Sequence, residues 1–223
     1  MNYVLGVVAL GVIAFFTGKL IKHKSLYPFM PFRYDFRKRR DTFRLSLKLL
    51  TQIGAKTIIE TGTSREGLKG AKSNGAATIV LGKWAKENGA FLHSVDISNE
   101  AVDNAQKEVN THNLREVIEI HLSDSLEFLR TFDAPVDFLY LDSYDYSHTD
   151  IEIQQKSQEH HLLEFQAIEG QLHANSVVLI DDCDLPNGGK GKTVIAYMLK
   201  KGWKVIANSY QVLLVREDFV IQE

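Results

Sequence analysis

Residues Thr57 to Thr63 read TIIETGT, and this stretch decides the fold. Its apolar residues are typical of a short buried strand, and Gly62 marks a turn directly after it. Because glycine has no Cβ, the main-chain N–H groups of such a turn can approach a ligand closely. Glu60 places an acid at the strand end, which a phosphate-binding loop would avoid, so the stretch favours a cationic or amine-bearing ligand.

A second strand is expected over residues 90–95, and it ends at Asp96. In a nucleotide-binding βαβ unit, an acid at the end of the second strand suits the two hydroxyls of a ribose. No G-x-G-x-x-G follows the first strand, which disfavours an NAD-dependent dehydrogenase. The two strand ends together indicate a ligand that carries a ribose.

Further apolar segments continue the alternation of strands and helices. The central strand at 136–141, VDFLYL, is apolar almost throughout, as expected of a parallel strand that is buried on both faces. The remaining strands are expected at 117–122, 177–180, 203–207 and 212–215, with helices at 41–53, 76–88, 99–112, 150–170 and 192–200. This pattern predicts an α/β fold, with a Rossmann-like, mostly parallel seven-stranded sheet flanked by helices.

Acidic residues follow five of the expected strands. In an open parallel sheet, ligands bind outside the carboxyl ends of the strands, so these side chains should converge on one rim. They are Glu60, Asp96, Asp124, Asp142, Asp181 and Asp182. Carboxylates on one rim repel one another, so a cation must offset some of them. Ligands that are all oxygen favour a hard ion such as Mg²⁺.

The motifs TIIETGT and LDSYDYSH, with the acid at Asp96 between them, resemble the class I S-adenosylmethionine-dependent methyltransferases. Within this class, the sequence resembles the metal-dependent small-molecule O-methyltransferases, which include the catechol-type enzymes. The resemblance covers residues 55–217 and implies an antiparallel C-terminal strand and S-adenosylmethionine as cofactor. It also implies O-methylation of a hydroxyl on a small-molecule acceptor, with a divalent metal such as Mg²⁺ held by Asp142, Asp181 and Asp182.

The resemblance also implies a set of cofactor contacts. These are Glu60, Gly62, Thr63, Asp96, Ser123, Asp124 and Asp142. Ser123 and Asp124 could equally cap the helix that follows them, and the three metal-site aspartates could be helix caps or solvated loop residues. The glycine-rich loop at 64–75 is longer than the family's usual turn and could reshape the pocket.

A base must take the proton of the acceptor hydroxyl. Catechol-type relatives place a lysine three residues after the first metal aspartate, but Asp145 stands there, which counts against a catecholic acceptor. The catalytic candidates are Asp142, Tyr144, Asp145 and His148, of which histidine has the best unperturbed pKa. His160 and His161 are expected on a helix and receive no role.

Residues 1–21 are expected to form an N-terminal transmembrane helix that anchors the chain. The run from Tyr3 to Leu20 is apolar apart from Thr17 and Lys19, and its length is near the lower limit for spanning a bilayer. Basic residues follow this run, so the positive-inside rule predicts a single-pass membrane protein whose catalytic domain faces the cytoplasm. A buried or interfacial helix is the alternative.

The rest of the chain divides into two parts by charge. Residues 22–40 include the basic run RYDFRKRR and are expected to form a juxtamembrane linker beside anionic headgroups, with the methyltransferase domain over 41–223. The chain has 26 basic and 28 acidic residues, and nine of the basic and two of the acidic residues lie before residue 45. The folded part therefore has 17 basic and 26 acidic residues, a net charge of -9. Nucleic acid is therefore a poor partner.

Two other function classes stay open. A metal-dependent nucleotide-sugar glycosyltransferase could also use strand-end acids, but Glu60 would face a diphosphate. A non-catalytic binding protein on the same fold is disfavoured by the intact acids and by Gly62, although they do not exclude it. Cys183 is the single cysteine, so no disulfide forms within one chain. The sequence does not indicate an oligomeric state.

Overall fold

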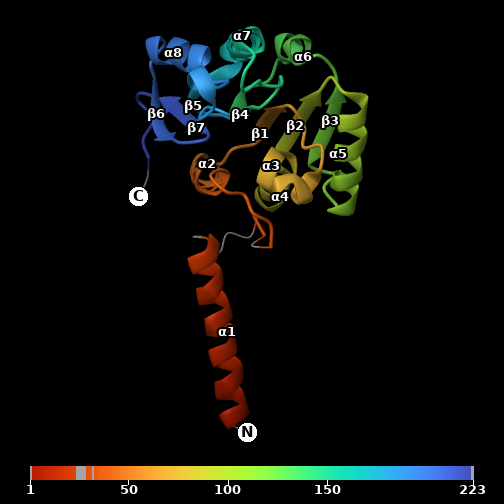
Figure 1. The fold of residues 1–223 in the computed structure, drawn as a ribbon, viewed down its shortest axis with the longest axis vertical. Coiled ribbons are helices and arrows are strands. Elements are labelled where there is room, and N and C mark those ends of the chain that lie inside the picture. The colour runs from red at the N-terminus through yellow and green to blue at the C-terminus, as the bar shows by residue number, and fades with distance from the viewer. Residues whose placement is uncertain (1, 24–28, 32, 222–223) are drawn as a thin grey trace.

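Seven strands form one sheet in the order β3-β2-β1-β4-β5-β7-β6 (Figure 1). A computed structural model provides this arrangement and describes residues 2–23, 29–31 and 33–221. The strands are β1 (Thr57–Thr61), β2 (Phe91–Asp96), β3 (Ile118–Leu122), β4 (Val136–Leu141), β5 (Leu172–Ile180), β6 (Trp203–Asn208) and β7 (Val212–Arg216). The central strand β1 pairs in parallel with both β2 and β4.

The C-terminal edge of the sheet is antiparallel. Strand β7 lies between β5 and β6 and runs antiparallel to both. The prediction of a Rossmann-like, mostly parallel seven-stranded sheet with an antiparallel C-terminal strand is therefore confirmed. This order leaves the carboxyl ends of β1, β2, β4 and β5 on one rim, where the strand-end acids lie.

Helices cover both faces of the sheet. They are α2 (Arg39–Ile53), α3 (Ala71–Asn74), α4 (Ala77–Asn88), α5 (Asn99–Thr111), α6 (Ser125–Thr131), α7 (Ile151–Ile168) and α8 (Lys192–Lys200), with short 3₁₀ turns at Gly67–Gly70, Glu169–Gln171 and Pro186–Gly188. Successive strand residues point to opposite faces. Ile58 therefore packs in the core under α2 and α4, and Ile59 packs in the core under α7 and α8.

The N-terminal helix α1 (Asn2–His23) stands apart from the α/β domain in Figure 1. Among the described residues, no helix has both the length and the apolar character needed to cross a membrane. Lys19 and Lys22 fall inside α1, which leaves an uncharged run shorter than the ~20 residues that a bilayer needs. The predicted transmembrane helix, and with it the single-pass membrane localisation, is wrong.

The end of the basic run belongs to the packed domain. Helix α2 begins at Arg39, and the side chains of Arg39 and Arg40 are buried against other parts of the chain. The expected boundary at residue 41 therefore cuts through packed structure. Part of the expected linker, residues 24–28 and 32, lies outside the described residues.

Candidate active site

Gly62 forms the turn after β1 and lies between the ends of two neighbouring strands. Its N–H donates to the Val95 carbonyl oxygen at 2.8 Å, and its φ of +84° is a conformation that side chains disfavour. A Cβ built there would lie 2.4 Å from the main-chain oxygen of Asp142. Glycine is therefore required for β1 and β4 to end side by side, and the turn has no side chain that could cover the rim.

Glu60 points into the protein rather than toward the rim. Its carboxylate accepts hydrogen bonds from the hydroxyls of Thr78 at 2.7 Å and Ser94 at 2.5 Å, and the side chain is buried. Burial raises the pKa of Glu60 to about 7, although both hydroxyls oppose the shift. Both hydroxyls donate to the same oxygen, Oε2, and the contact of Glu60 with the cofactor stays a prediction.

Thr78, at the start of α4, connects Glu60 to the turn after β1. Its hydroxyl accepts from the N–H of Ser64 at 2.9 Å, and its own N–H donates to the Ser64 hydroxyl at 3.1 Å. The Thr63 hydroxyl lies 3.3 Å from that of Thr78. The main chain that follows Gly62 is therefore held in one position by buried side chains.

Asp96 is oriented by two main-chain donors. One carboxylate oxygen accepts from the N–H of Thr63 at 3.1 Å and the other from the N–H of Ser98 at 2.8 Å. A carboxylate has about four acceptor sites, so two remain for further donors such as ribose hydroxyls. The structure brings Gly62, Thr63 and Asp96 together at the ends of β1 and β2.

Ser123 and Asp124 follow β3, farther along the same rim. The Asp124 carboxylate caps α6 by accepting from the N–H groups of Leu126 and Glu127, at 2.8 and 3.1 Å. The Ser123 hydroxyl donates to the Asp124 carbonyl at 3.1 Å. These contacts give Asp124 the capping arrangement that the sequence left open beside a cofactor contact, whereas the Ser123 hydroxyl accepts from no N–H of the helix.

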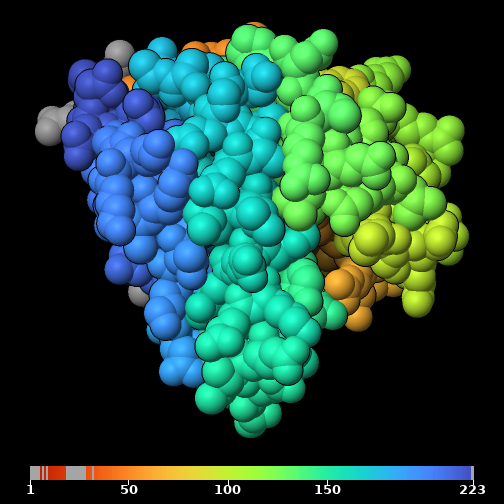
Figure 2. Space-filling view, turned by 90° about the horizontal axis from the view of Figure 1, so that it is seen from above, coloured from red at the N-terminus to blue at the C-terminus, as the bar shows by residue number. Residues whose placement is uncertain are grey.

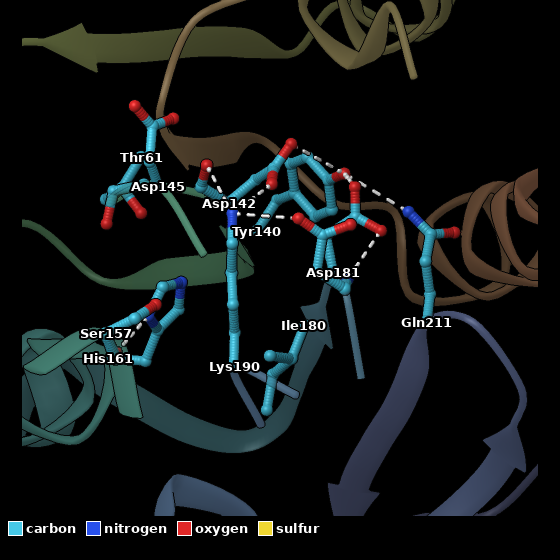
Figure 3. Close-up of polar contacts among 12 residues, drawn as sticks. Thr61, Tyr140, Asp142, Asp145, Ser157, His161, Ile180, Asp181, Lys190 and Gln211 are labelled. Carbon is cyan, nitrogen blue, oxygen red and sulfur yellow. Dashed lines mark hydrogen bonds and ion pairs between the residues drawn. The ribbon is translucent and has the colours of Figure 1, made fainter. Parts of the chain in front are cut away.

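Asp142, Asp181 and Asp182 come together at the ends of β4 and β5, as expected, but two basic side chains lie among them. The Lys190 ammonium contacts Asp142 at 3.0 Å and Asp182 at 3.1 Å. Figure 3 shows Lys190 reaching up to the aspartates. Burial alone would lower the pKa of Lys190, but the charges of Asp142 and Asp182 raise it above its ordinary value. Lys190 is therefore a cation held inside the site.

Arg39 contacts the other side of the cluster. Its guanidinium donates to both carboxylate oxygens of Asp181, at 2.8 and 3.1 Å, and to Asp182 at 3.2 Å. It also donates to the Ser73 carbonyl at 3.1 Å and stacks over the Tyr210 ring. Arg39 is 6% exposed, so these contacts are shielded from water.

Asp181 is held by three donors. Besides Arg39, it accepts from the Tyr140 hydroxyl at 2.7 Å and from the N–H of Asp182 at 2.9 Å, and Tyr140 in turn accepts from Gln211 at 3.1 Å (Figure 3). The group of described residues that brings three potential ligand atoms within 4.8 Å of one another lies elsewhere, at His93, Glu119 and His121. The predicted aspartate set, engaged by two cations, does not fit a divalent metal.

The predicted base candidates lie in the β4–α7 connection. Asp145 is exposed and pairs with Arg65 at 3.4 Å, and His148 is exposed as well. Tyr144 is 43% exposed, and its ring packs against that of His160 with centroids 5.2 Å apart. Asp142 is the one catalytic candidate that contacts the buried cluster.

Some site residues were not predicted from the sequence. Lys190 and Arg39 are two of them, and a third is His160, whose Nε2 lies 3.3 Å from Glu164 and 3.1 Å from the Ser125 hydroxyl. The signal for Lys190 was present in the glycines around it, NGGKG at 187–191, just after the Asp181 and Asp182 pair. The buried Arg39 lay in a basic run that resembled a solvated segment.

Seen from above, the rim is open between two segments. In Figure 2 the orange segment after β1 and the teal segment around the β4–α7 connection are visible on the same face, with a hollow between them. Gly62 and Asp142, at the beginning of these two segments, are neighbours through their main chains.

Comparison with known proteins assigns the family. A family described as "Methyltransferase domain" matches residues 72–183, which is half of the chain. Among curated proteins, no sequence matches this chain significantly.

Solved structures share the fold at low sequence identity. The SAH-bound methyltransferase PaMTH1 from Podospora anserina has a TM-score of 0.58 at 12% identity, over 90% of this chain and 88% of that one. Cofactor-bound Rv0187 from MTB has a TM-score of 0.61 at 14% identity, over 92% and 90%. The O-methyltransferase TomG from Streptomyces achromogenes, in complex with SAM, has a TM-score of 0.56 at 16% identity, over 82% of each chain.

The order of the strands, the glycine turn after β1 and the family match agree with one another and confirm the resemblance inferred from the sequence. The chain belongs to the methyltransferase family, with the fold of the class I S-adenosylmethionine-dependent enzymes.

Proposed function

We propose that this chain transfers the methyl group of S-adenosylmethionine to a hydroxyl oxygen of a small molecule. The observation that carries the proposal is the Gly62 turn, which exposes main chain between the ends of β2 and β4 beside the oriented carboxylate of Asp96. Ribose hydroxyls are the donors that the free acceptor sites of Asp96 suit. The solved O-methyltransferase TomG, with SAM bound, has the same fold.

The chain's own residues have three tasks in this reaction. Asp96 holds the cofactor, which supplies an electrophilic methyl group when bound. The ends of β1 and β4 fix the reacting atoms on one side of the rim and keep the transfer in line. Asp142 accepts the proton as the hydroxyl oxygen forms its bond to the methyl carbon and the sulfur–carbon bond breaks.

Asp142 suits the role of proton acceptor by position and by environment. It follows β4 directly, and its main-chain oxygen is the atom that a Cβ at Gly62 would strike. Burial raises the pKa of Asp142 above its ordinary value, with Asp181 and Asp182 adding to the shift and Lys190 opposing it. A carboxylate with a raised pKa is a stronger base at neutral pH.

The acceptor is a hydroxyl compound other than a catechol. The lysine that catechol-type relatives use after the first aspartate is replaced by Asp145, which points outward to Arg65. No metal enters this proposal, because Arg39 and Lys190 engage the three aspartates.

The test is a methyl-transfer assay on the full chain against a panel of hydroxyl compounds, with S-adenosylhomocysteine binding measured in parallel. Asp142→Asn should lower kcat by about 10²- to 10⁴-fold while binding is retained. Asp133→Asn, an exposed aspartate before β4, is the control and should leave both unchanged. Turnover of Asp142→Asn at the wild-type rate would contradict the assigned base.

A further inference from the structure

We propose that Lys190 and Arg39 supply the positive charge that a divalent ion supplies in metal-dependent methyltransferases, so that this enzyme needs no metal. The inference rests on the proposed function, because it concerns the same rim. It makes Lys190 a positioning residue for the acceptor. Its test uses metal binding and cofactor binding as separate readouts.

The charges balance as they would with a metal. Asp142, Asp181 and Asp182 carry three negative charges when ionised. The two basic side chains supply two positive charges, the same number as one divalent ion. The side chains of Arg39 and Lys190 are 7% and 6% exposed. Buried charges must be paired to be tolerated, so these cations are part of the folded site rather than mobile surface groups.

The contacts use the oxygens that a metal would need. The Asp181 carboxylate accepts hydrogen bonds from Arg39, Tyr140 and a main-chain N–H. Lys190 lies between Asp142 and Asp182, within 3.1 Å of an oxygen of each. A divalent ion that joined Asp142 to Asp182 would therefore compete with Lys190 for these oxygens.

The conformation of the loop after β5 positions the side chain of Lys190 beside the aspartates. Gly189 has a φ of +56°, and a Cβ there would lie 1.9 Å from the main-chain oxygen of Asp182. The N–H of Lys190 donates to that same oxygen at 3.1 Å. The chain therefore folds back on Asp182 at a position where only glycine fits, and the next side chain enters the aspartate cluster.

Lys190 also has a hydrogen to offer the acceptor. Its Nζ atom lies 3.0 Å from the Asp142 carboxylate, 3.1 Å from the Asp182 carboxylate and 3.4 Å from the Asp142 main-chain oxygen, so the third of its three possible hydrogen bonds is the longest. An acceptor oxygen next to Asp142 would compete for this third donor. Lys190 would then hold that oxygen where a metal ion holds it in metal-dependent enzymes.

The experiment titrates Mg²⁺ into the EDTA-treated full chain by calorimetry, for the wild type, Lys190→Ala and Lys192→Ala. Lys192 is an exposed lysine two residues away and is the matched control. We expect no Mg²⁺ binding to the wild type or to Lys192→Ala. Lys190→Ala should gain one Mg²⁺ site, because Asp142 and Asp182 lose their shared cation.

Methyl transfer by the wild type should stay within about twofold when EDTA is added. Binding of one Mg²⁺ by the wild type, or loss of turnover in EDTA, would overturn the inference, and so would a folded Lys190→Ala that gains no Mg²⁺ site. If Lys190→Ala does not fold, the wild-type titration decides alone. Failure of the wild type to bind S-adenosylhomocysteine would instead reject the proposed function.

A different observation carries a second proposal. We infer that His93, Glu119 and His121 form a site for a transition-metal ion such as Zn²⁺. Nδ1 of His93 lies 3.1 Å from Nε2 of His121, and these atoms lie 3.9 and 3.7 Å from the Glu119 carboxylate. Ligand atoms of a tetrahedral zinc site, with bonds of about 2.1 Å, are about 3.4 Å apart. The three ligands therefore need only small adjustments.

The surroundings suit imidazole ligands. His93 and His121 lie on the neighbouring strands β2 and β3, on the face under α6, where Phe128 packs on both rings. Burial lowers the pKa of both histidines, which keeps the imidazoles neutral and able to bind metal. The bound ion would join the edge strand β3 to β2.

This site is tested by Zn²⁺ titration of the full chain with a thermal melt. The wild type should bind one Zn²⁺ and gain thermal stability, and His121→Gln should lose both effects. His112→Gln, which removes a half-buried histidine paired with Glu108, is the control and should keep them. Absent binding in the wild type, or equal binding in His121→Gln, would overturn the site.

Discussion

The replacement Glu60→Gln tests the buried hydrogen-bond network beneath the cofactor turn. Glu60 is 1% exposed and accepts from Thr78 and Ser94. Glutamine has the same shape as protonated glutamate, and its amide oxygen can accept from the same two hydroxyls. The substitution therefore removes the titration of this side chain and leaves its packing in place.

The size of the effect follows from the pKa of Glu60, which burial raises from an ordinary 4.5 to about 7. A raised folded-state pKa means that the stability contributed by the protonated carboxyl is full below pH 4.5 and is lost as the pH rises through 7. The difference is about 2.5 pKa units, or about 3 kcal/mol at most. The wild type should match the variant at low pH and be less stable than it above neutrality.

The assay is urea unfolding of both proteins at several pH values between about 5 and 8.5. The free energy of unfolding of Glu60→Gln, relative to the wild type, should rise with pH and level off near 3 kcal/mol. Glu87→Gln, an exposed acid on α4, should show a difference near zero throughout. A constant difference, or a variant that is less stable than the wild type at about pH 8, would refute the reasoning.

Three further substitutions test the rim. Gly62→Ala should abolish S-adenosylhomocysteine binding in calorimetry and destabilise the fold by at least ~2 kcal/mol, because φ is +84° and the new Cβ meets Asp142; wild-type affinity would contradict this. Asp96→Asn should weaken S-adenosylhomocysteine binding by about 10- to 100-fold, whereas Asp103→Asn, at an exposed position, should not change it. Equal affinity of Asp96→Asn and the wild type would contradict the contact between Asp96 and the ribose. Arg39→Met should lower the free energy of unfolding by about 3–5 kcal/mol, because it leaves the buried Asp181 without its cation. Arg44→Met, at an exposed position, is the control. An equal loss of stability in the two variants would show that the Arg39–Asp181 pair is not important for stability.

Much of the sheet could be predicted because its signals are local. The apolar strands are recognised from their hydrophobic pattern, and Gly62 and the strand-end acids are recognised from the few residues around each turn. Ligands bind at the carboxyl ends of parallel strands, and this rule predicts that Asp142 and Asp181 lie close together. The structure has this sheet, and the Tyr140 hydroxyl contacts both Asp142 and Asp181, at 3.3 and 2.7 Å.

The cations in the site could not be predicted in the same way. Arg39 meets Asp181 across 142 residues, and Lys190 meets Asp142 across 48, and such pairings depend on tertiary packing. The strand-end acids and the resemblance predicted a metal as the balancing charge, and the structure places Arg39 and Lys190 beside these acids. The direction of Glu60 was also hidden, since the hydroxyls that hold it, Thr78 and Ser94, lie on α4 and β2.

The N-terminal segment was misjudged for a physical reason. The apolar run of α1 is close to the length of a bilayer span, and the lysines near its end shorten the uncharged part. The basic residues after it were assigned to a linker, but Arg40 donates to main-chain oxygens of Met30 and Tyr34 inside the fold. Composition alone does not separate a solvated basic run from one that caps and pairs within a domain.

The most direct measurement is calorimetric titration of S-adenosylhomocysteine into the full chain in the presence of EDTA. We expect one equivalent to bind with micromolar affinity, about -8 kcal/mol, and the binding to be the same when Mg²⁺ replaces EDTA. No binding under either condition would contradict the assignment of the cofactor site at Gly62 and Asp96. Binding that requires Mg²⁺ would contradict the account in which Arg39 and Lys190 take the place of the metal.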